Sequence, residues 1–199
     1  IDSFAKAGNE PNFTVILSVK DKATRLPDSP RFRRPSAWTP PHNLFEQAVL
    51  PLELAFAGLD VLHSTDFIPP FRRNFKSVIS VLDLAFLLFP DAVTAEAKRY
   101  YGQIYRAVDS ADGIIAISES TKLDMVRLLG VSPDRVTVTH LGVDPGFRPL
   151  DSLAGQKFCQ DNGLPQDFAL FVGTIEPRKN LGALGQSQQE LATRVGVSR

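Results

Sequence analysis

The sequence predicts an α/β fold built on a parallel sheet, and two observations lead to this prediction. Short apolar runs alternate with longer amphipathic segments through residues 60–139. Gly, Pro, Asn and Asp residues separate many of these runs, as expected where a chain turns. Alternating strands and helices are typical of a parallel sheet with helices over both faces. We therefore expect this architecture for the larger part of the chain.

The N-terminal part predicts one strand, one loop and one helix. Residues 13–18 follow turn-forming residues and are rich in β-forming side chains, which indicates a buried strand. Residues 20–41 are polar and rich in Arg and Pro, so we expect a long exposed loop. A helix is predicted to begin at Asn43, with Glu46 placed for a capping box, and to end at Gly58. Its apolar residues recur at about helical spacing: Leu44, Val49, Leu52 and Phe56.

The central part predicts four strands and two helices. The strands are expected at 60–63, 77–81, 113–117 and 136–139, and the helices at 95–110 and 120–129. The second helix should end at Gly130. The first should turn four side chains inward: Tyr101, Ile104, Tyr105 and Val108.

Two domains are expected, separated by a linker. Residues 145–167 are rich in Pro and Gly and predict a linker with a short helix, and the apolar run 168–173 predicts a new strand. The domain boundaries are therefore placed at 1–148 for the first domain, 149–167 for the linker and 168–199 for the start of the second domain. Because the sequence begins at Ile1 without Met, we expect it to be a fragment.

The composition argues against several classes of protein. The chain has 22 basic and 22 acidic residues, and a neutral chain lacks the basic surface that nucleic-acid binding requires. A single cysteine, Cys159, allows neither an internal disulfide nor a cysteine metal site, and it fits a reducing compartment. No apolar run reaches the roughly 20 residues of a membrane-spanning helix. The segment with Arg31, Arg33 and Arg34 leaves a peripheral contact with acidic lipids open.

Polar residues gather where the predicted strands end, which is where open parallel sheets bind ligands. They are His63, Asp83, Ser118, Glu119, Ser120, His140, Asp144, Arg178 and Lys179. In the last of these places Asn180 can cap a helix, and Arg178 and Lys179 come just before it. A helix N-terminus flanked by two cations suits a diphosphate, and Gly173 permits close approach of the backbone.

The stretch Phe171-Val-Gly-Thr-Ile-Glu-Pro-Arg-Lys-Asn-Leu181 closely resembles the start of the second domain in family 4 retaining glycosyltransferases. Three further pieces occur in the order found in that family. They are Asp83-Leu84 followed by Phe89-Pro90, Ile115 to Ser120, and Val136 to Phe147 with its His-Leu-Gly-Val-Asp string. The resemblance covers residues 60–181.

This resemblance implies a GT-B fold of two Rossmann-like domains, with the first strand of the first domain missing here. It implies transfer of a hexose from a nucleotide sugar to a glycan or lipid-linked acceptor with retention of configuration. Mannose is the favoured hexose, because the sequence of the turn 173–180 resembles that of O-antigen mannosyltransferases. The implied location is the cytoplasm, including the inner face of the membrane, and no metal or other cofactor is expected.

The resemblance also implies roles for individual residues. Asp83, Arg178 and Lys179 would be catalytic. The donor would be bound by Gly173, Glu176, Arg178, Lys179 and Asn180. Ser118, Glu119 and Ser120 would line the acceptor side. His63 is placed with them as a polar neighbour, and a purely structural hydrogen-bonding role for this lone histidine stays open.

The sequence departs from the family at several points. Leu82 stands where the family usually carries a histidine, the paired glutamates of the second domain lie beyond the sequence, and the tail 182–199 is polar. These departures keep a second hypothesis open, namely a non-catalytic fragment of such an enzyme. A two-domain sugar-binding protein of periplasmic type is a third.

Overall fold

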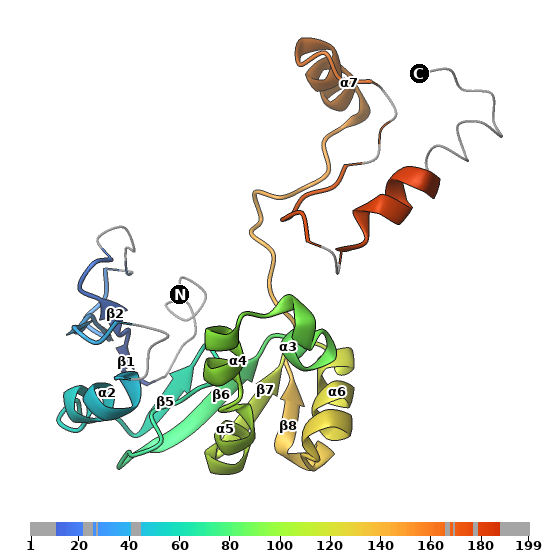
Figure 1. Cartoon of the computed structure of the whole chain (residues 1–199). Helices are drawn as coiled ribbons and strands as arrows, with labels where there is room; N and C mark the ends of the chain where they lie inside the picture. Colours follow the sequence, from blue (N-terminus) through green and yellow to red (C-terminus); the bar gives the residue numbers. More distant parts are fainter. Residues whose placement is uncertain are drawn as a thin grey trace. The chain divides into compact units, whose positions relative to one another are not determined.

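The computed structural model describes residues 11–21, 26, 28–40, 45–165, 168, 170–176 and 179–187. The chain divides into two compact units, Ile1–His140 and Leu141–Arg199, and each is considered by itself (Figure 1). The first unit holds a four-stranded sheet with the order β5-β6-β7-β8. Its strands are β5 (Val61–Ser64), β6 (Lys76–Val81), β7 (Gly113–Ala116) and β8 (Val136–Val138). All three neighbouring pairs are parallel, which confirms the predicted fold class.

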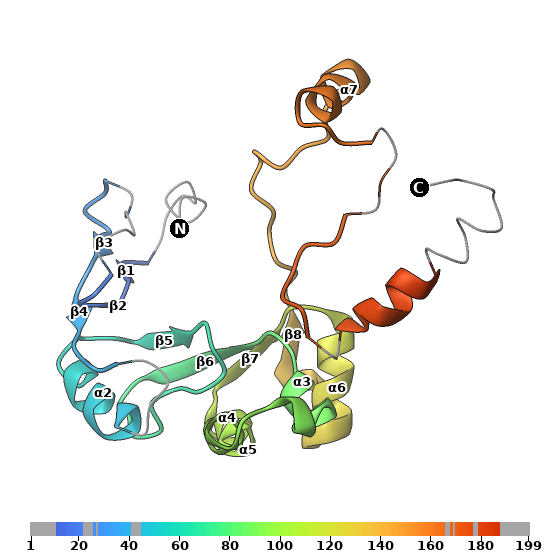
Figure 2. The ribbon, with the colours of Figure 1, turned by 45° about the horizontal axis from the view of Figure 1, so that its top comes forward.

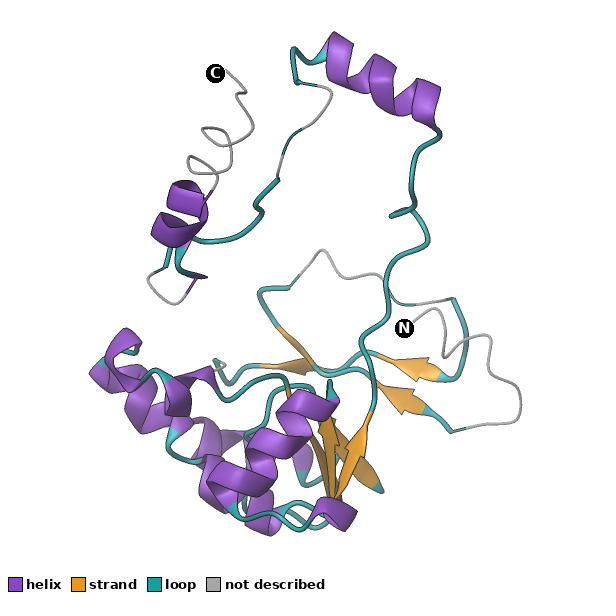
Figure 3. Ribbon diagram, turned by 90° about the vertical axis from the view of Figure 1, so that its right-hand side faces the viewer, coloured by secondary structure: helices purple, strands orange, loops and turns teal. Residues whose placement is uncertain are grey.

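The helices of the described residues agree with several sequence predictions. They are α2 (Glu46–Leu54), α3 (Ala85–Leu88), α4 (Ala95–Tyr101), α5 (Ile104–Ser110), α6 (Glu119–Leu129) and α7 (Ser152–Asp161), with 3₁₀ turns η1 (Pro90–Ala92) and η2 (Pro133–Arg135). Helix α6 ends as predicted at Gly130, whose φ of 67° is the left-handed conformation typical of a glycine C-cap. Figure 3 colours these elements by type. Within the described ranges, we find no helix long and apolar enough to cross a membrane.

The core lies between the sheet and the helices on one of its faces. Ile79, Ile114 and Val136 are register neighbours in β6, β7 and β8, and each is at most 3% exposed. Helices α4, α5 and α6 cover this face (Figure 2). Because β6, β7 and β8 follow one another in one direction across the sheet, right-handed crossovers place all their helices on the same side. The sequence predicted helices over both faces of the sheet, and the described residues show them over one face. On the other face, His63 and Thr137 are exposed.

The predicted helix 95–110 is divided into two helices, α4 and α5. Of the four side chains predicted to point inward, one is exposed. The break falls between α4 and α5 at residues 102–103, where Gly102 weakens the helix. Ile104 and Val108 are buried as predicted, but Tyr105 is 51% exposed. Because α5 starts anew at Ile104, Tyr105 no longer continues the face of α4.

The predicted strand 13–18 and loop 20–41 are both corrected. The strand is split into β1 (Phe13–Thr14) and β2 (Leu17–Ser18), which are half-buried. They pair in parallel with β3 (Phe32–Arg33) and β4 (Ser36–Ala37), which lie inside the predicted loop. Pro35 stands between β3 and β4 and has no N–H to donate, so it interrupts the ladder.

Helix α2 exposes the residues whose spacing suggested an amphipathic face. It ends at Leu54, before Gly58, and Leu54 is its buried residue. Leu52 and Phe56 are 70% and 96% exposed, and Val49 is exposed as well. The predicted start at Asn43 and the apolar Leu44 lie outside the described residues.

The second unit contains the predicted short helix but not the predicted strand in its described part. Helix α7 is capped by Asp151, whose Oδ1 accepts a hydrogen bond of 2.8 Å from the Ala154 amide. The described residues of the run 168–172, namely 168 and 170–172, form no strand, and their apolar side chains are exposed. A parallel strand needs a neighbour, and the described residues of this unit offer none.

Ser77 provides a direct test of the packing beneath α5. It is fully buried, and its Oγ has no hydrogen-bond partner among the described residues. Because a buried hydroxyl without a partner costs free energy, we expect Ser77→Ala to raise the free energy of unfolding by about 1 kcal/mol. Urea denaturation measures this change. Ser80→Ala is the matched control, because its Oγ is bonded to His63; it should lower stability, and an equal loss in both variants would refute the interpretation.

Candidate acceptor-side and donor-side residues

The carboxyl ends of the strands meet at one edge of the sheet in the first unit. Val81, Ala116 and Val138 are register neighbours at the ends of β6, β7 and β8. Asp83 and Ser118 each follow two residues later. The sequence therefore predicted correctly that these polar residues leave the sheet at the same edge.

Asp83 lies two residues before the short helix α3. Its Oδ1 accepts a hydrogen bond of 2.9 Å from the Ala85 amide, and its side chain is exposed. The preceding Leu82 is 48% exposed, and a leucine side chain neither donates nor accepts a hydrogen bond. Leu84, on the other side, is buried in the core. The aspartate is thus presented to solvent on a turn whose C-terminal side is anchored by Leu84 in the core.

Ser118 caps helix α6, while Glu119 and Ser120 are exposed on its first turn. The Ser118 Oγ accepts a hydrogen bond of 3.1 Å from the Thr121 amide. Thr121 was not predicted from the sequence, because the capping-box pattern has Glu or Gln, and not Thr, three residues after the Ser cap. Its Oγ1 lies 2.9 Å from the Ser118 Oγ and 3.3 Å from the Leu82 carbonyl oxygen. The structure therefore brings the Asp83 turn and the start of α6 together through Thr121.

His63 lies within β5 rather than after it. Its Nε2 is 2.8 Å from the Oγ of Ser80 on β6. His63 also lines a hollow of about 1150 Å³ bounded by β1, β2, α2 and β5. Tyr100 lines the same hollow, and burial, together with the charges of Glu46 and Asp66, raises its pKa well above the usual range, so the phenol stays protonated. His63 therefore contacts Ser80 and this hollow; its assignment to the acceptor side stays a prediction.

The predicted donor-binding turn lies in the second unit. Gly173 has a φ of 155°, which side-chain-bearing residues rarely adopt. The Thr174 hydroxyl donates to Glu176 Oε1 at 2.5 Å, and the Glu176 carbonyl accepts from the Lys179 amide at 3.0 Å. The Asn180 carbonyl accepts from Ala183 and Leu184 at the start of the helical residues 181–187, while Arg178 lies outside the described residues. Where side chains are described, no three His, Cys, Asp or Glu residues could hold a metal ion.

The fold defines an α/β protein with polar residues at the carboxyl edge of its sheet, and comparison with known proteins gives its class. The sequence profile of Glycosyltransferase Family 4 matches residues 4–147. This is more than half of the chain, and the chain therefore belongs to glycosyltransferase family 4.

Two relatives carry names that agree with this assignment. The O-antigen chain mannosyltransferase B of Escherichia coli is 28% identical over 133 residues, which cover 66% of this chain and 35% of that protein. The D-inositol 3-phosphate glycosyltransferase 2 of Catenulispora acidiphila is 40% identical over 92 residues, covering 45% of this chain and 21% of the relative. A solved glycosyltransferase of Rickettsia africae ESF-5 aligns with a TM-score of 0.40 at 16% identity, over 67% of this chain and 37% of that one. The chain thus spans about a third or less of these relatives.

Proposed function

We propose that the chain is part of a hexosyltransferase that moves a sugar, with mannose favoured, from a nucleotide sugar to a glycan or lipid-linked acceptor with retention of configuration. The observation that carries this proposal is the family match over residues 4–147. The mannosyltransferase of Escherichia coli supports mannose as the first sugar to test.

In this proposal the complete protein has a GT-B arrangement. The first unit contributes Asp83, the catalytic carboxylate, and the acceptor-side residues His63, Ser118, Glu119 and Ser120. The second contributes the turn 173–180, where Lys179 and Arg178 would neutralise the donor diphosphate as it leaves. No metal is required, because the cations and a helix N-terminus supply the positive charge.

We further propose that the enzyme works in the cytoplasm, in contact with lipid when its acceptor is lipid-linked. Exposed apolar side chains on and beside α2 support such a contact: Trp38, Phe45, Leu52 and Phe56. Arg33 and Arg34 are also exposed in the same unit. Exposed aromatic and basic side chains are typical of surfaces that bind acidic headgroups.

A transfer assay tests the proposed reaction. The chain is incubated with GDP-mannose, UDP-glucose and related donors labelled in the sugar, and the acceptor fraction is analysed for label. We expect transfer from one of these donors, and NMR of the product should show the anomeric configuration of the donor. Inversion would contradict the retaining mechanism, and a folded chain without transfer from any donor would contradict the proposed activity.

A second candidate is a non-catalytic polypeptide of the same family. Two observations favour it, namely Leu82 before the predicted catalytic aspartate and the exposed apolar residues 170–172. A protein of this kind would still bind an acceptor sugar through the first unit. Binding of glycans without any transfer in the assay above would select this candidate.

A further inference from the structure

Thr121 occupies an unusual place for a threonine near the start of a helix. It is the third residue of α6 and is 8% exposed, so its hydroxyl is shielded from water. The hydroxyl contacts one group on its own helix cap, Ser118, and one on a different strand end, the Leu82 carbonyl. Leu82 is 39 residues away in sequence, so this is a tertiary contact rather than local capping.

The number of hydroxyl protons decides the direction of these hydrogen bonds. Thr121 has one hydroxyl proton, and it is donated to the Leu82 carbonyl, which can only accept. The Ser118 hydroxyl must then donate to Thr121 Oγ1, while Ser118 Oγ accepts from the Thr121 amide. The hydrogen bond from the Thr121 amide to Ser118 Oγ already caps the helix. The threonine hydroxyl is therefore available to hold the Leu82 carbonyl.

The anchored carbonyl belongs to the residue directly before Asp83. The Leu82 side chain is half-exposed and gives the turn little packing, whereas Leu84 is 2% exposed. The turn is therefore held at three points: the Leu82 carbonyl by Thr121, the Asp83 carboxylate by the Ala85 amide, and Leu84 by the core. Loss of the first point would free the N-terminal side of the turn.

We propose that Thr121 is a positioning residue that fixes Asp83 relative to Ser118, Glu119 and Ser120 through the Leu82 carbonyl. This role rests on the proposed function, in which these four residues face the sugar substrates. It names a residue that acts through others, because the Thr121 hydroxyl is itself buried against protein groups.

Amide hydrogen exchange in the 199-residue chain tests the link without any assay of activity. Thr121→Val keeps the shape of the side chain and the backbone amide that donates to the Ser118 cap, but removes the hydroxyl. We expect it to speed exchange of the Ala85 amide about tenfold, the effect of losing one hydrogen bond, while the Met125 amide within α6 is unchanged. Thr121→Ser retains the hydroxyl and should restore slow exchange at Ala85.

The controls separate this link from a general loss of stability. Thr137→Val alters an exposed threonine on β8 and should leave Ala85 unchanged. The proposal is overturned if Thr121→Val leaves exchange at Ala85 within twofold of the parent chain. It is also overturned if Ala85 and Met125 accelerate equally. If Thr121→Val does not fold, the parent chain decides: NMR should show a protected Thr121 hydroxyl proton close to Leu82, and its absence refutes the proposal.

Steady-state kinetics then test the consequence for the reaction. In the transfer assay, Thr121→Val should lower kcat about tenfold with little change in the KM of the donor, and Thr121→Ser should recover most of kcat. An unchanged kcat in an active enzyme overturns the positioning role. If the parent chain transfers no sugar, the proposed function fails, while the exchange experiment still decides whether Thr121 holds the turn.

Discussion

Replacing Arg73 with methionine is expected to lower the free energy of unfolding by about 3 kcal/mol, because two partly buried carbonyl groups would lose a charged donor. The Arg73 side chain is 9% exposed. Its guanidinium donates to the Pro70 carbonyl at 3.1 Å and to the Ser110 carbonyl, and it lies 3.8 Å from the Asp112 carboxylate. Methionine has a similar length and fills the space without any donor. Urea denaturation followed by circular dichroism measures the loss.

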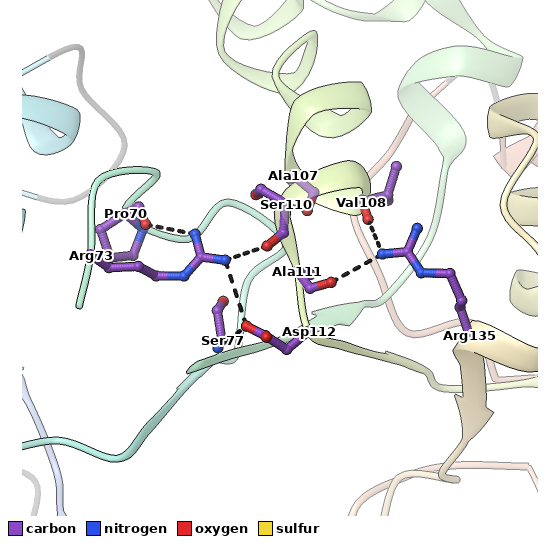
Figure 4. Close-up of polar contacts among 9 residues, drawn as sticks. All are labelled: Pro70, Arg73, Ser77, Ala107, Val108, Ser110, Ala111, Asp112 and Arg135. Atoms are coloured by element: carbon purple, nitrogen blue, oxygen red, sulfur yellow. Dashed lines mark hydrogen bonds and ion pairs between the residues drawn. The ribbon is translucent and has the colours of Figure 1, made fainter. Parts of the chain in front are cut away.

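The size of this effect follows from what Arg73 connects. Ser110 is the last residue of α5, and carbonyl groups at the end of a helix have no partner within the helix. Asp112 in turn accepts a hydrogen bond of 2.8 Å from the Ser77 amide at the start of β6 (Figure 4). Arg73 therefore joins the end of α5, the start of β6 and the loop between β5 and β6.

Arg135 supports the same helix end from the other side. Its guanidinium donates to the Val108 carbonyl at 2.8 Å and the Ala111 carbonyl at 3.0 Å (Figure 4). Cations at a helix C-terminus satisfy its free carbonyls and interact favourably with its dipole. With Arg73 removed, Arg135 still holds part of this end, which is why we expect a large loss of stability rather than complete unfolding.

Arg127→Met is the matched control for Arg73→Met. Arg127 lies 2.8 Å from Asp124, a shorter separation than that between Arg73 and Asp112, but its side chain is 65% exposed. Exposed ion pairs contribute little because water already solvates both charges, so we expect a loss below about 1 kcal/mol. Equal losses in the two variants would mean that distance, not burial and carbonyl satisfaction, determines the contribution, and would contradict our interpretation.

The sequence predicted the central sheet well because its signals are local. β6 and β7 are rich in Val, Ile and Ala side chains that are buried or half-buried, and α6 begins after the capping residue Ser118 and ends at Gly130. The pairing of β1 and β2 with β3 and β4 could not be predicted in this way, since residues 32–37 contain Arg33, Arg34 and Pro35 and lack an apolar run. What makes them strands is a neighbour elsewhere in the chain, which periodicity does not reveal.

The same distinction applies to the candidate site. The position of Asp83 and Ser118 at one sheet edge follows from the parallel pairing of β6 with β7 and could be predicted. The hydrogen bonds of Arg73 and Thr121 could not be predicted. They join residues 37 and 39 positions apart, and their acceptors are backbone carbonyls, which no residue type identifies. Carbonyl acceptors are present at every residue, so only the fold selects the one that is used.

The double substitution Arg178→Ala and Lys179→Ala is expected to reduce transfer about 10³-fold or more in the active enzyme, because two cations would be lost where negative charge develops on the leaving diphosphate. Removal of a single group that stabilises such charge typically costs 10²–10³-fold in kcat. Single substitutions should each give part of the loss. Measurement of kcat and of the KM for the nucleotide sugar distinguishes weakened donor binding from slower chemistry.

Stability and a distant lysine provide the controls for this prediction. Lys179 is exposed and its amide, which the substitution retains, makes the hydrogen bond to Glu176, so the melting temperature of the double variant should match that of the parent. Lys157→Ala on α7 removes another exposed cation, 3.9 Å from Asp161, and should leave transfer unchanged. Normal turnover in the double variant would exclude the turn 173–180 as the diphosphate site. An equal fall in the Lys157 variant would instead indicate a general effect of charge, since long-range attraction of an anionic donor depends on the summed charge rather than on one turn.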